Sequence, residues 1–177
     1  MLNRIRKPPQ PRVEQDLYRA LVARSREKIF YQEWGVADTI DGRFDLLVLH
    51  AFLIFDTLKG QGAQAKELGS KLADVIFTGF DEALRELGIS DFGMGRRIRN
   101  MADAFYGRLH HYGLAGTPAE LAAAVQRNLY RGESRRAGEA AGLATYMSGA
   151  RERLKLDLAA ILAGKPDFGP LPGPRDG

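Results

Sequence analysis

The stretch RFDLLVLHAFLIFDTLKG, residues 43–60, decides the fold class of this chain. Between Asp45 and Asp56 it is apolar on every side when drawn as a helix, with His50 as its polar interruption. The length favours a helix over a buried strand, and a helix that is apolar all round belongs at the centre of a bundle. Spanning a bilayer takes about 20 apolar residues, so this run is too short to cross one.

Outside this stretch, apolar residues recur every three or four positions, which is the period of an amphipathic helix. No segment shows sustained two-residue alternation, the pattern of a half-buried strand. We therefore predict an all-α, single-domain bundle of about six helices, because each apolar stripe needs a partner to cover it. Of the other helical patterns, the first starts at Arg12. The rest cover residues 63–88, 91–113, 117–131 and 143–161.

The best local signal for a helix start lies in GTPAEL, residues 116–121. Thr117 is placed as an N-cap, Pro118 as the first helical residue, and Glu120 as the glutamate of a capping box. The helical domain is predicted to cover residues 12–164. Residues 1–11 are expected to be a basic, proline-rich arm, and residues 165–177 a disordered tail rich in proline and glycine.

Composition narrows the classes of function. Of the 177 residues, 45% are apolar and 27% charged, which is ordinary for a globular domain. The chain has no cysteine, which excludes a disulfide scaffold, a thiol nucleophile and a cysteine-based zinc or iron–sulfur site. The net charge of +4 is mild, but residues 1–28 are markedly basic. Such an end attracts RNA or anionic lipid, or is simply solvated.

No arrangement of side chains predicts an enzyme. Asp91, Phe92 and Gly93 spell the metal-binding motif of kinases, but the glycine-rich loop and the catalytic loop are missing. His50 is predicted to be a hydrogen-bonded core residue. His110 and His111 point about 100° apart on a helix, so they cannot hold one metal ion together. We therefore predict a non-enzyme with no cofactor and no metal.

One metal-dependent alternative rests on three aspartates. Asp38, Asp41 and Asp45 are spaced closely enough to hold a magnesium ion, as in an isoprenoid-type enzyme. Such an enzyme needs a second acidic cluster on a facing helix, and the sequence shows none. Asp38 and Asp41 are predicted to serve the turn, and Asp45 the first turn of a helix through the macrodipole.

A ridge of charged and aromatic residues lies beside the apolar stripe of residues 91–113. Arg96, Arg99, Tyr106 and His110 share this ridge on a helix. Arginine and tyrosine anchor many protein interfaces, so the ridge predicts a partner-binding surface. A solvated helix face is the competing interpretation, and the residues alone leave both open.

Two long blocks of this sequence are similar to the ubiquinol–cytochrome c chaperone family. GVADTIDGRFDLLVLHAFLIFDTLKG, residues 35–60, resembles the family's run D-T-x-D-G-R-F-x-L-L-x-L-H. FDEALRELGISDFGMGRRIRNMADAFYGRLHHY, residues 80–112, resembles its second block, which ends in M-A-x-A-F-Y-G-R. Together the similar parts cover about residues 30–165. The chain resembles a bacterial member, of the kind found in α-proteobacteria.

This resemblance implies a chaperone that binds newly made cytochrome b and assists assembly of ubiquinol–cytochrome c reductase, respiratory complex III. It implies a cytoplasmic location that includes the surface of the inner membrane. A second assembly factor, the membrane and the ribosome are further candidate partners, and no specific DNA is expected. The alternative function is an RNA- or ribosome-binding module that uses the basic amino-terminal region.

The partner-binding residues are expected to lie in the two blocks that carry the resemblance. Their aromatic rings would supply apolar contact and their arginines would meet carboxylates or lipid phosphates. Gly107 is interpreted as a point of close backbone approach. The predicted partner-binding residues are Phe30, Tyr31, Trp34, Asp41, Arg43, Phe44, Arg96, Arg97, Arg99, Phe105, Tyr106 and Arg108.

Overall fold

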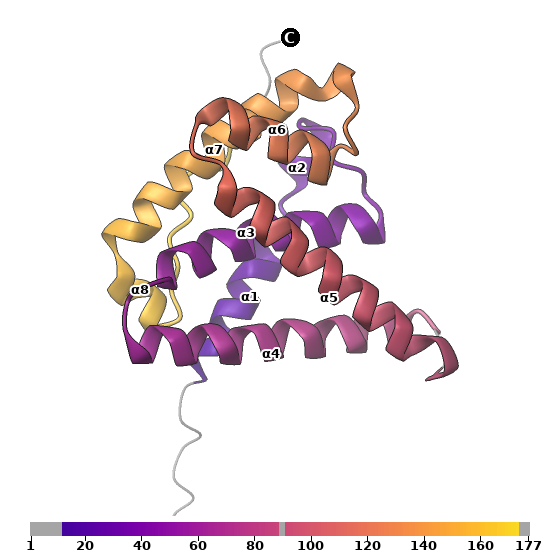
Figure 1. The fold of residues 1–177 in the computed structure, drawn as a ribbon, viewed down its shortest axis with the longest axis vertical. Helices are drawn as coiled ribbons and strands as arrows, with labels where there is room; N and C mark the ends of the chain where they lie inside the picture. Colours follow the sequence, from indigo (N-terminus) through magenta and orange to yellow (C-terminus); the bar gives the residue numbers. More distant parts are fainter. Residues whose placement is uncertain (1–11, 89–90, 174–177) are drawn as a thin grey trace, which may run out of the picture.

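The computed structural model describes residues 12–88 and 91–173 (Figure 1). These residues form α-helices linked by short turns. The predicted six helices are confirmed as the long helices of the chain, and two five-residue helices add to them. The helices are α1 (Val13–Ser25), α2 (Lys28–Gln32), α3 (Ile40–Leu58), α4 (Ala63–Glu86), α5 (Asp91–Leu114), α6 (Pro118–Leu129), α7 (Ala137–Leu156) and α8 (Leu158–Leu162), with a 3-10 turn, η1 (Ser134–Arg136), before α7.

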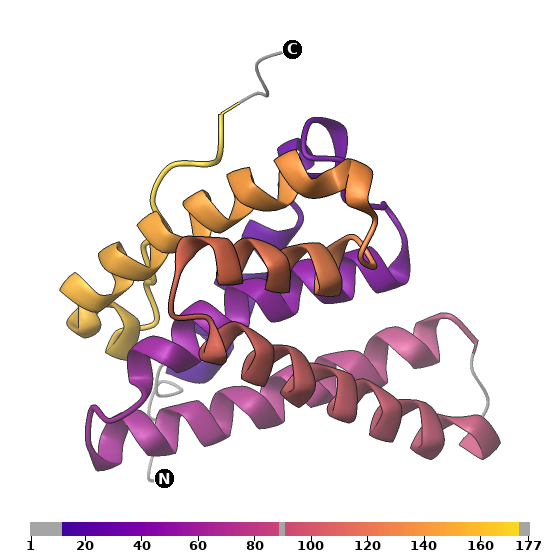
Figure 2. The same ribbon diagram turned by 45° about the horizontal axis from the view of Figure 1, so that its top comes forward.

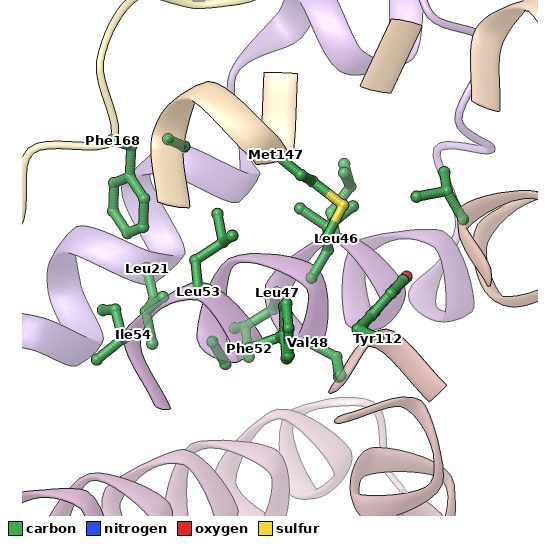
Figure 3. Close-up of a cluster of buried hydrophobic side chains, with 14 of the residues drawn as sticks. Leu21, Leu46, Leu47, Val48, Phe52, Leu53, Ile54, Tyr112, Met147 and Phe168 are labelled. Carbon is green, nitrogen blue, oxygen red and sulfur yellow. The ribbon is translucent and has the colours of Figure 1, made fainter. Parts of the chain in front are cut away.

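Helix α3 is the centre of the bundle. Every residue from Asp45 to Ile54 is buried, because α3 contacts α1, α4, α5, α6 and α7 on its different sides. Figure 3 shows leucines and Phe52 of α3 packed among Leu21 of α1, Tyr112 of α5 and Met147 of α7. A helix that is covered all round has no polar face, which explains why residues 46–55 lack one.

Helices α4 and α5 form a hairpin that extends beyond the rest of the bundle (Figure 2). Leu68, Leu72, Ile76, Phe80 and Leu84 of α4 are buried along one stripe, as the spacing predicts. On α5 the buried stripe includes Phe105 and Tyr112. Near its outer part, Leu84 of α4 and Met101 of α5 lie across a hollow from Phe44 at the start of α3.

The start of α3 differs from the sequence-based expectation. The helix begins at Ile40, and Thr39 caps it by accepting a hydrogen bond from the backbone N–H of Gly42 at 3.1 Å. Asp41 therefore lies in the first turn, whereas Asp45 lies one turn later and is fully buried. The predicted cap of α6 is confirmed, with both hydrogen bonds of a capping box between Thr117 and Glu120.

Residues 165–173, which were predicted to be part of a disordered tail, pack against the bundle. The Phe168 side chain is 6% exposed, and its ring lies 5.4 Å from that of His50. Arg24 and Trp34 donate hydrogen bonds to three carbonyl groups of this segment. The composition of the segment does not predict this packing, because one buried aromatic side chain and a row of carbonyl acceptors are enough to hold a proline-rich chain. The proposed arm over residues 1–11 lies outside the described residues.

Among the residues that the structure describes, no helix combines the length and the apolar character needed to cross a membrane.

Candidate partner-binding surface

A buried carboxylate, that of Asp45, joins three parts of the fold. It forms ion pairs of 2.8 Å with Arg108 of α5 and with Arg131, which follows α6. Asp45 is fully buried, whereas the side chains of Arg108 and Arg131 are 16% and 49% exposed. The two guanidinium groups therefore extend from a fixed internal anion toward the surface, and Asp45 determines where they lie.

The backbone at Arg131 is shaped for this contact. Its φ of 56° is in the left-handed region, which glycine usually occupies at the end of a helix. The N–H of Gly132 bonds the carbonyl of Gln126 at 3.0 Å, which closes the turn at the end of α6. A side chain in this region costs about 1 kcal/mol. The ion pair with Asp45 offsets that cost and explains how an arginine is held there.

Burial raises the pKa of Asp45 to about 6, and the positive charges of Arg108 and Arg131 oppose this shift without cancelling it. Tyr112 and Asn128 are buried next to this carboxylate, and burial also raises the pKa of the Tyr112 hydroxyl. The cluster is therefore a polar region inside an apolar bundle, and its charge state depends on pH near neutrality.

Asp45 is expected to make the unfolding free energy fall as the pH rises from 5 to 7.5. Its pKa is about 3.8 when unfolded and about 6 when folded, so the folded chain holds the proton more tightly in this window. Linkage then gives a loss on the order of 1 kcal/mol for this group. The measurement is chemical unfolding of the wild type and Asp45→Asn at both pH values. The loss should appear in the difference between the two proteins, and parallel pH profiles would contradict the assignment.

A groove opens beside this cluster, between the start of α3 and the α4–α5 hairpin. Its volume is about 270 Å³. The floor is apolar, with Phe44 lying under Arg108 at 5.2 Å from ring centroid to guanidinium carbon. Ile40 is 51% exposed at the edge, so its apolar side chain is open to solvent there. We call this the arginine-rimmed groove; it is lined by Ile40, Phe44, Leu84 and Met101, with Arg97, Arg108 and Arg131 at its rim.

The structure brings four of the predicted partner-binding residues to this groove: Asp41, Phe44, Arg97 and Arg108. It places Phe30 and Phe105 elsewhere, since both side chains are completely buried. Neither side chain is open to a partner in the folded chain, and both are interpreted here as core residues. Phe30 packs against His50 and Tyr146, and Phe105 packs against Phe77 and Phe80.

The remaining predicted residues lie on separate surfaces. Tyr31 and Arg43 line a cavity of about 500 Å³ with Arg26 and Lys28, and Arg43 is paired with Asp38 at 2.8 Å. Trp34 packs on α7 and the carboxyl-terminal segment. Arg96, Arg99 and Tyr106 are exposed on α5 but do not line the arginine-rimmed groove.

Sequence reasoning missed Arg131, Leu84 and the role of Asp45. Arg131 carried no signal, because it lies in a turn outside both blocks that suggested a function. Leu84 was recognised as an apolar residue of its helix, but periodicity does not say which apolar residues line a groove. Asp45 was visible as a charge inside the most apolar stretch, and its position there was the signal that it has partners.

The structure does not support a metal site at the aspartates. Asp38 faces Arg43, and Asp45 faces Arg108 and Arg131. Within residues 12–88 and 91–173, no three His, Cys, Asp or Glu side chains converge as ligands. The expected core role of His50 is confirmed, since its ring nitrogens bond the Leu46 carbonyl at 2.8 Å and the Tyr146 hydroxyl at 2.9 Å. Burial lowers the pKa of His50 to about 3.

Comparisons with known proteins agree on one family. Residues 32–168 match the family model described as ubiquinol-cytochrome C chaperone. The crystal structure of the Cbp3 homolog from Brucella abortus superposes with a TM-score of 0.77 at 35% identity, covering 86% of each chain. Ubiquinol-cytochrome-c reductase complex assembly factor 1 of Xenopus laevis is 24% identical over 115 residues. That match covers 64% of this chain and 58% of the Xenopus protein, so it spans less than two thirds of the relative's length.

Proposed function

Because the chain belongs to the ubiquinol–cytochrome c chaperone family, we propose that it is a non-enzymatic chaperone for the assembly of ubiquinol–cytochrome c reductase. Its client in this proposal is newly made cytochrome b, held at the arginine-rimmed groove. The supporting observation is the groove itself, where apolar side chains are left open beside three arginines. The surface of the inner membrane and a second assembly factor are further partners in the proposal.

The chemistry of the groove suits a hydrophobic polypeptide segment with acidic or phosphate-bearing surroundings. Ile40, Phe44 and Met101 offer apolar contact, and arginine binds carboxylates and phosphates through paired N–H donors. The buried Asp45 orients Arg108 and Arg131 before any partner arrives. Binding then loses little entropy in ordering these two side chains. Holding a client in this way requires no chemical step.

Arg97→Glu is expected to lower the capture of cytochrome b at least about fivefold, because loss of an interface arginine commonly costs more than about 1 kcal/mol. The measurement is co-purification of newly made cytochrome b with the tagged full-length chain. Arg99→Glu is the matched control. It makes the same charge change at an exposed position of the same helix, away from the groove.

Capture should therefore stay close to the wild-type level in Arg99→Glu. Equal capture by the wild type and both variants would remove the arginine-rimmed groove from the proposal. An equal loss in both variants would show that general positive charge, rather than this groove, attracts the client. Circular dichroism of each variant confirms that the helices are intact.

A further inference from the structure

The segment of residues 165–173, called here the C-terminal segment, runs beside α7 and is bonded by Arg24 of α1 and by Trp34 (Figure 1). Arg24 donates hydrogen bonds from one Nη to the carbonyls of Gly169 and Pro170, at 2.7 and 3.1 Å. Trp34 donates from Nε1 to the carbonyl of Gly173 at 3.1 Å. All three bonds are accepted by backbone oxygens, so they hold an extended chain whatever its side chains are.

A single aromatic side chain anchors the segment. Phe168 is 6% exposed, and its ring packs edge-on against the ring of His50. The guanidinium group of Arg24 lies over the Phe168 ring. Figure 3 shows Phe168 pointing toward Leu53 and Leu21. Two prolines follow, at positions 170 and 172. Proline lacks an N–H and favours an extended backbone, so such a peptide is recognised through its carbonyls and its apolar side chains.

The receptor side of this contact is held in place by the bundle. Arg24 Nε donates to the Tyr146 hydroxyl at 2.9 Å, and the same hydroxyl bonds His50 Nε2 at 2.9 Å. The Trp34 carbonyl accepts from the Tyr130 hydroxyl at 2.7 Å. The Trp34 ring lies so close to Gly142 that a Cβ there would overlap it. The two donors are therefore positioned by contacts that do not involve the segment.

The groove is also larger than its occupant. A cavity of about 540 Å³ remains beside the segment. We call this site the α7 groove; it is lined by Trp34, Gly142, Tyr146, Gly149 and Ala150, together with the segment's own Phe168 and Leu171. A Cβ at Gly149 would meet nothing within 4 Å, so the space over this part of α7 is open.

The segment can leave without unwinding a helix. Helix α8 ends at Leu162, Gly164 follows with a φ of 77°, and the N–H of Lys165 bonds the carbonyl of Ala160 at 2.8 Å. This closes the last turn of α8 before the segment begins. Departure of residues 166–173 would break the hydrogen bonds from Arg24 and Trp34 and remove the Phe168 ring, and would leave every helix intact.

We infer that the α7 groove is a binding site for an extended peptide with an aromatic residue followed by prolines, supplied by a partner protein, and that the C-terminal segment is its resident competitor. The ligand class follows from the resident sequence Phe168-Gly-Pro-Leu-Pro172 and from the carbonyl-directed donors Arg24 and Trp34. The site lies on α1 and α7, away from the arginine-rimmed groove, so it does not depend on the proposed function.

The probe is a fluorescent peptide with the sequence of residues 165–173, added to the full-length chain. Phe168→Ala weakens the resident segment, so the labelled peptide should bind this variant at least tenfold more tightly than the wild type. Trp34 is the only tryptophan of the chain and bonds the segment, so energy transfer from Trp34 to the fluorophore of the probe should report that the probe has replaced the segment. No binding to either protein would overturn the inference.

Two glycine substitutions in the Phe168→Ala background locate the binding. Gly149→Gln fills the open part of the α7 groove and should abolish the tighter binding. Gly138→Gln is the matched control, since a Cβ there also meets nothing within 4 Å and this position does not line the groove. Equal binding by both variants would place the probe elsewhere and overturn the inference.

A second route keeps the test valid if Phe168→Ala does not fold. A protease site inserted between Lys165 and Pro166 is cut after the wild-type chain has folded, and the labelled peptide is then added. Exchange of the cut segment for the probe, with intact helices, supports the site, and unfolding without exchange overturns it. Chain dimers that form in place of probe binding would assign the groove to a second copy and would also overturn the proposed partner.

Discussion

Gly42→Ala is expected to lower the free energy of unfolding by about 3 kcal/mol, the upper part of the usual range for overpacking. A Cβ on Gly42 would overlap the carbonyl oxygen of Ala37, which belongs to the turn before α3. This oxygen accepts a hydrogen bond from Thr39 at 2.9 Å, and Thr39 in turn caps the helix. The turn therefore cannot move aside without losing the cap. Urea unfolding followed by circular dichroism measures the effect.

Gly107→Ala is the control for this substitution, and it tests an interpretation that the structure overturns. The sequence suggested close backbone approach at Gly107, but a Cβ there meets nothing within 4 Å. Alanine stabilises a helix by about 0.5–1 kcal/mol relative to glycine. We therefore expect Gly107→Ala to match or exceed the wild type in stability. A large loss at Gly107 with none at Gly42 would reverse the assignment of the two glycines.

The fold was predictable because its decisive signals are local. Residues 46–55 show the central helix through their composition alone, and Thr117 and Glu120 show the start of α6 through their spacing. Each of the other long helices has one apolar stripe, and such stripes packed around an apolar central helix leave few arrangements other than a bundle. The short helix α2 was not predicted, because five residues are too few to show a helical period. Helix α8 was predicted only as the end of one helix over residues 143–161, and the break at Asp157 was missed.

The candidate site was less predictable, because it depends on residues that are far apart in sequence. Asp45, Arg108 and Arg131 meet only when α3, α5 and the turn after α6 are packed together. Arg131 also occupies a left-handed position where a glycine would have been expected. The C-terminal segment could not be predicted from its composition either. Its proline and glycine content is typical of a disordered chain, but a few contacts with residues far away in the sequence hold it on the bundle.

Phe105→Ala is expected to cost about 3–5 kcal/mol of unfolding free energy, the range for removing a buried phenylalanine. Its ring is completely buried and packs against Phe77 of α4 at 5.3 Å between centroids, and Phe80 lies 6.4 Å away. Removing it opens a cavity between the two arms of the α4–α5 hairpin. Because this hairpin forms one wall of the arginine-rimmed groove, a loss of cytochrome b capture in this variant should follow from the loss of structure.

The neighbouring residue distinguishes a structural role from direct contact. Tyr106 is 55% exposed beside Phe105, so Tyr106→Ala is expected to cost less than about 1 kcal/mol. Both variants are compared by urea unfolding and by capture of cytochrome b from the same membranes. We expect stability and capture to fall together in Phe105→Ala, with recovery of both in Phe105→Leu because it restores most of the apolar volume. A stable Phe105→Ala variant that has lost capture would return Phe105 to the binding surface, and the packing of α4 against α5 would then need revision.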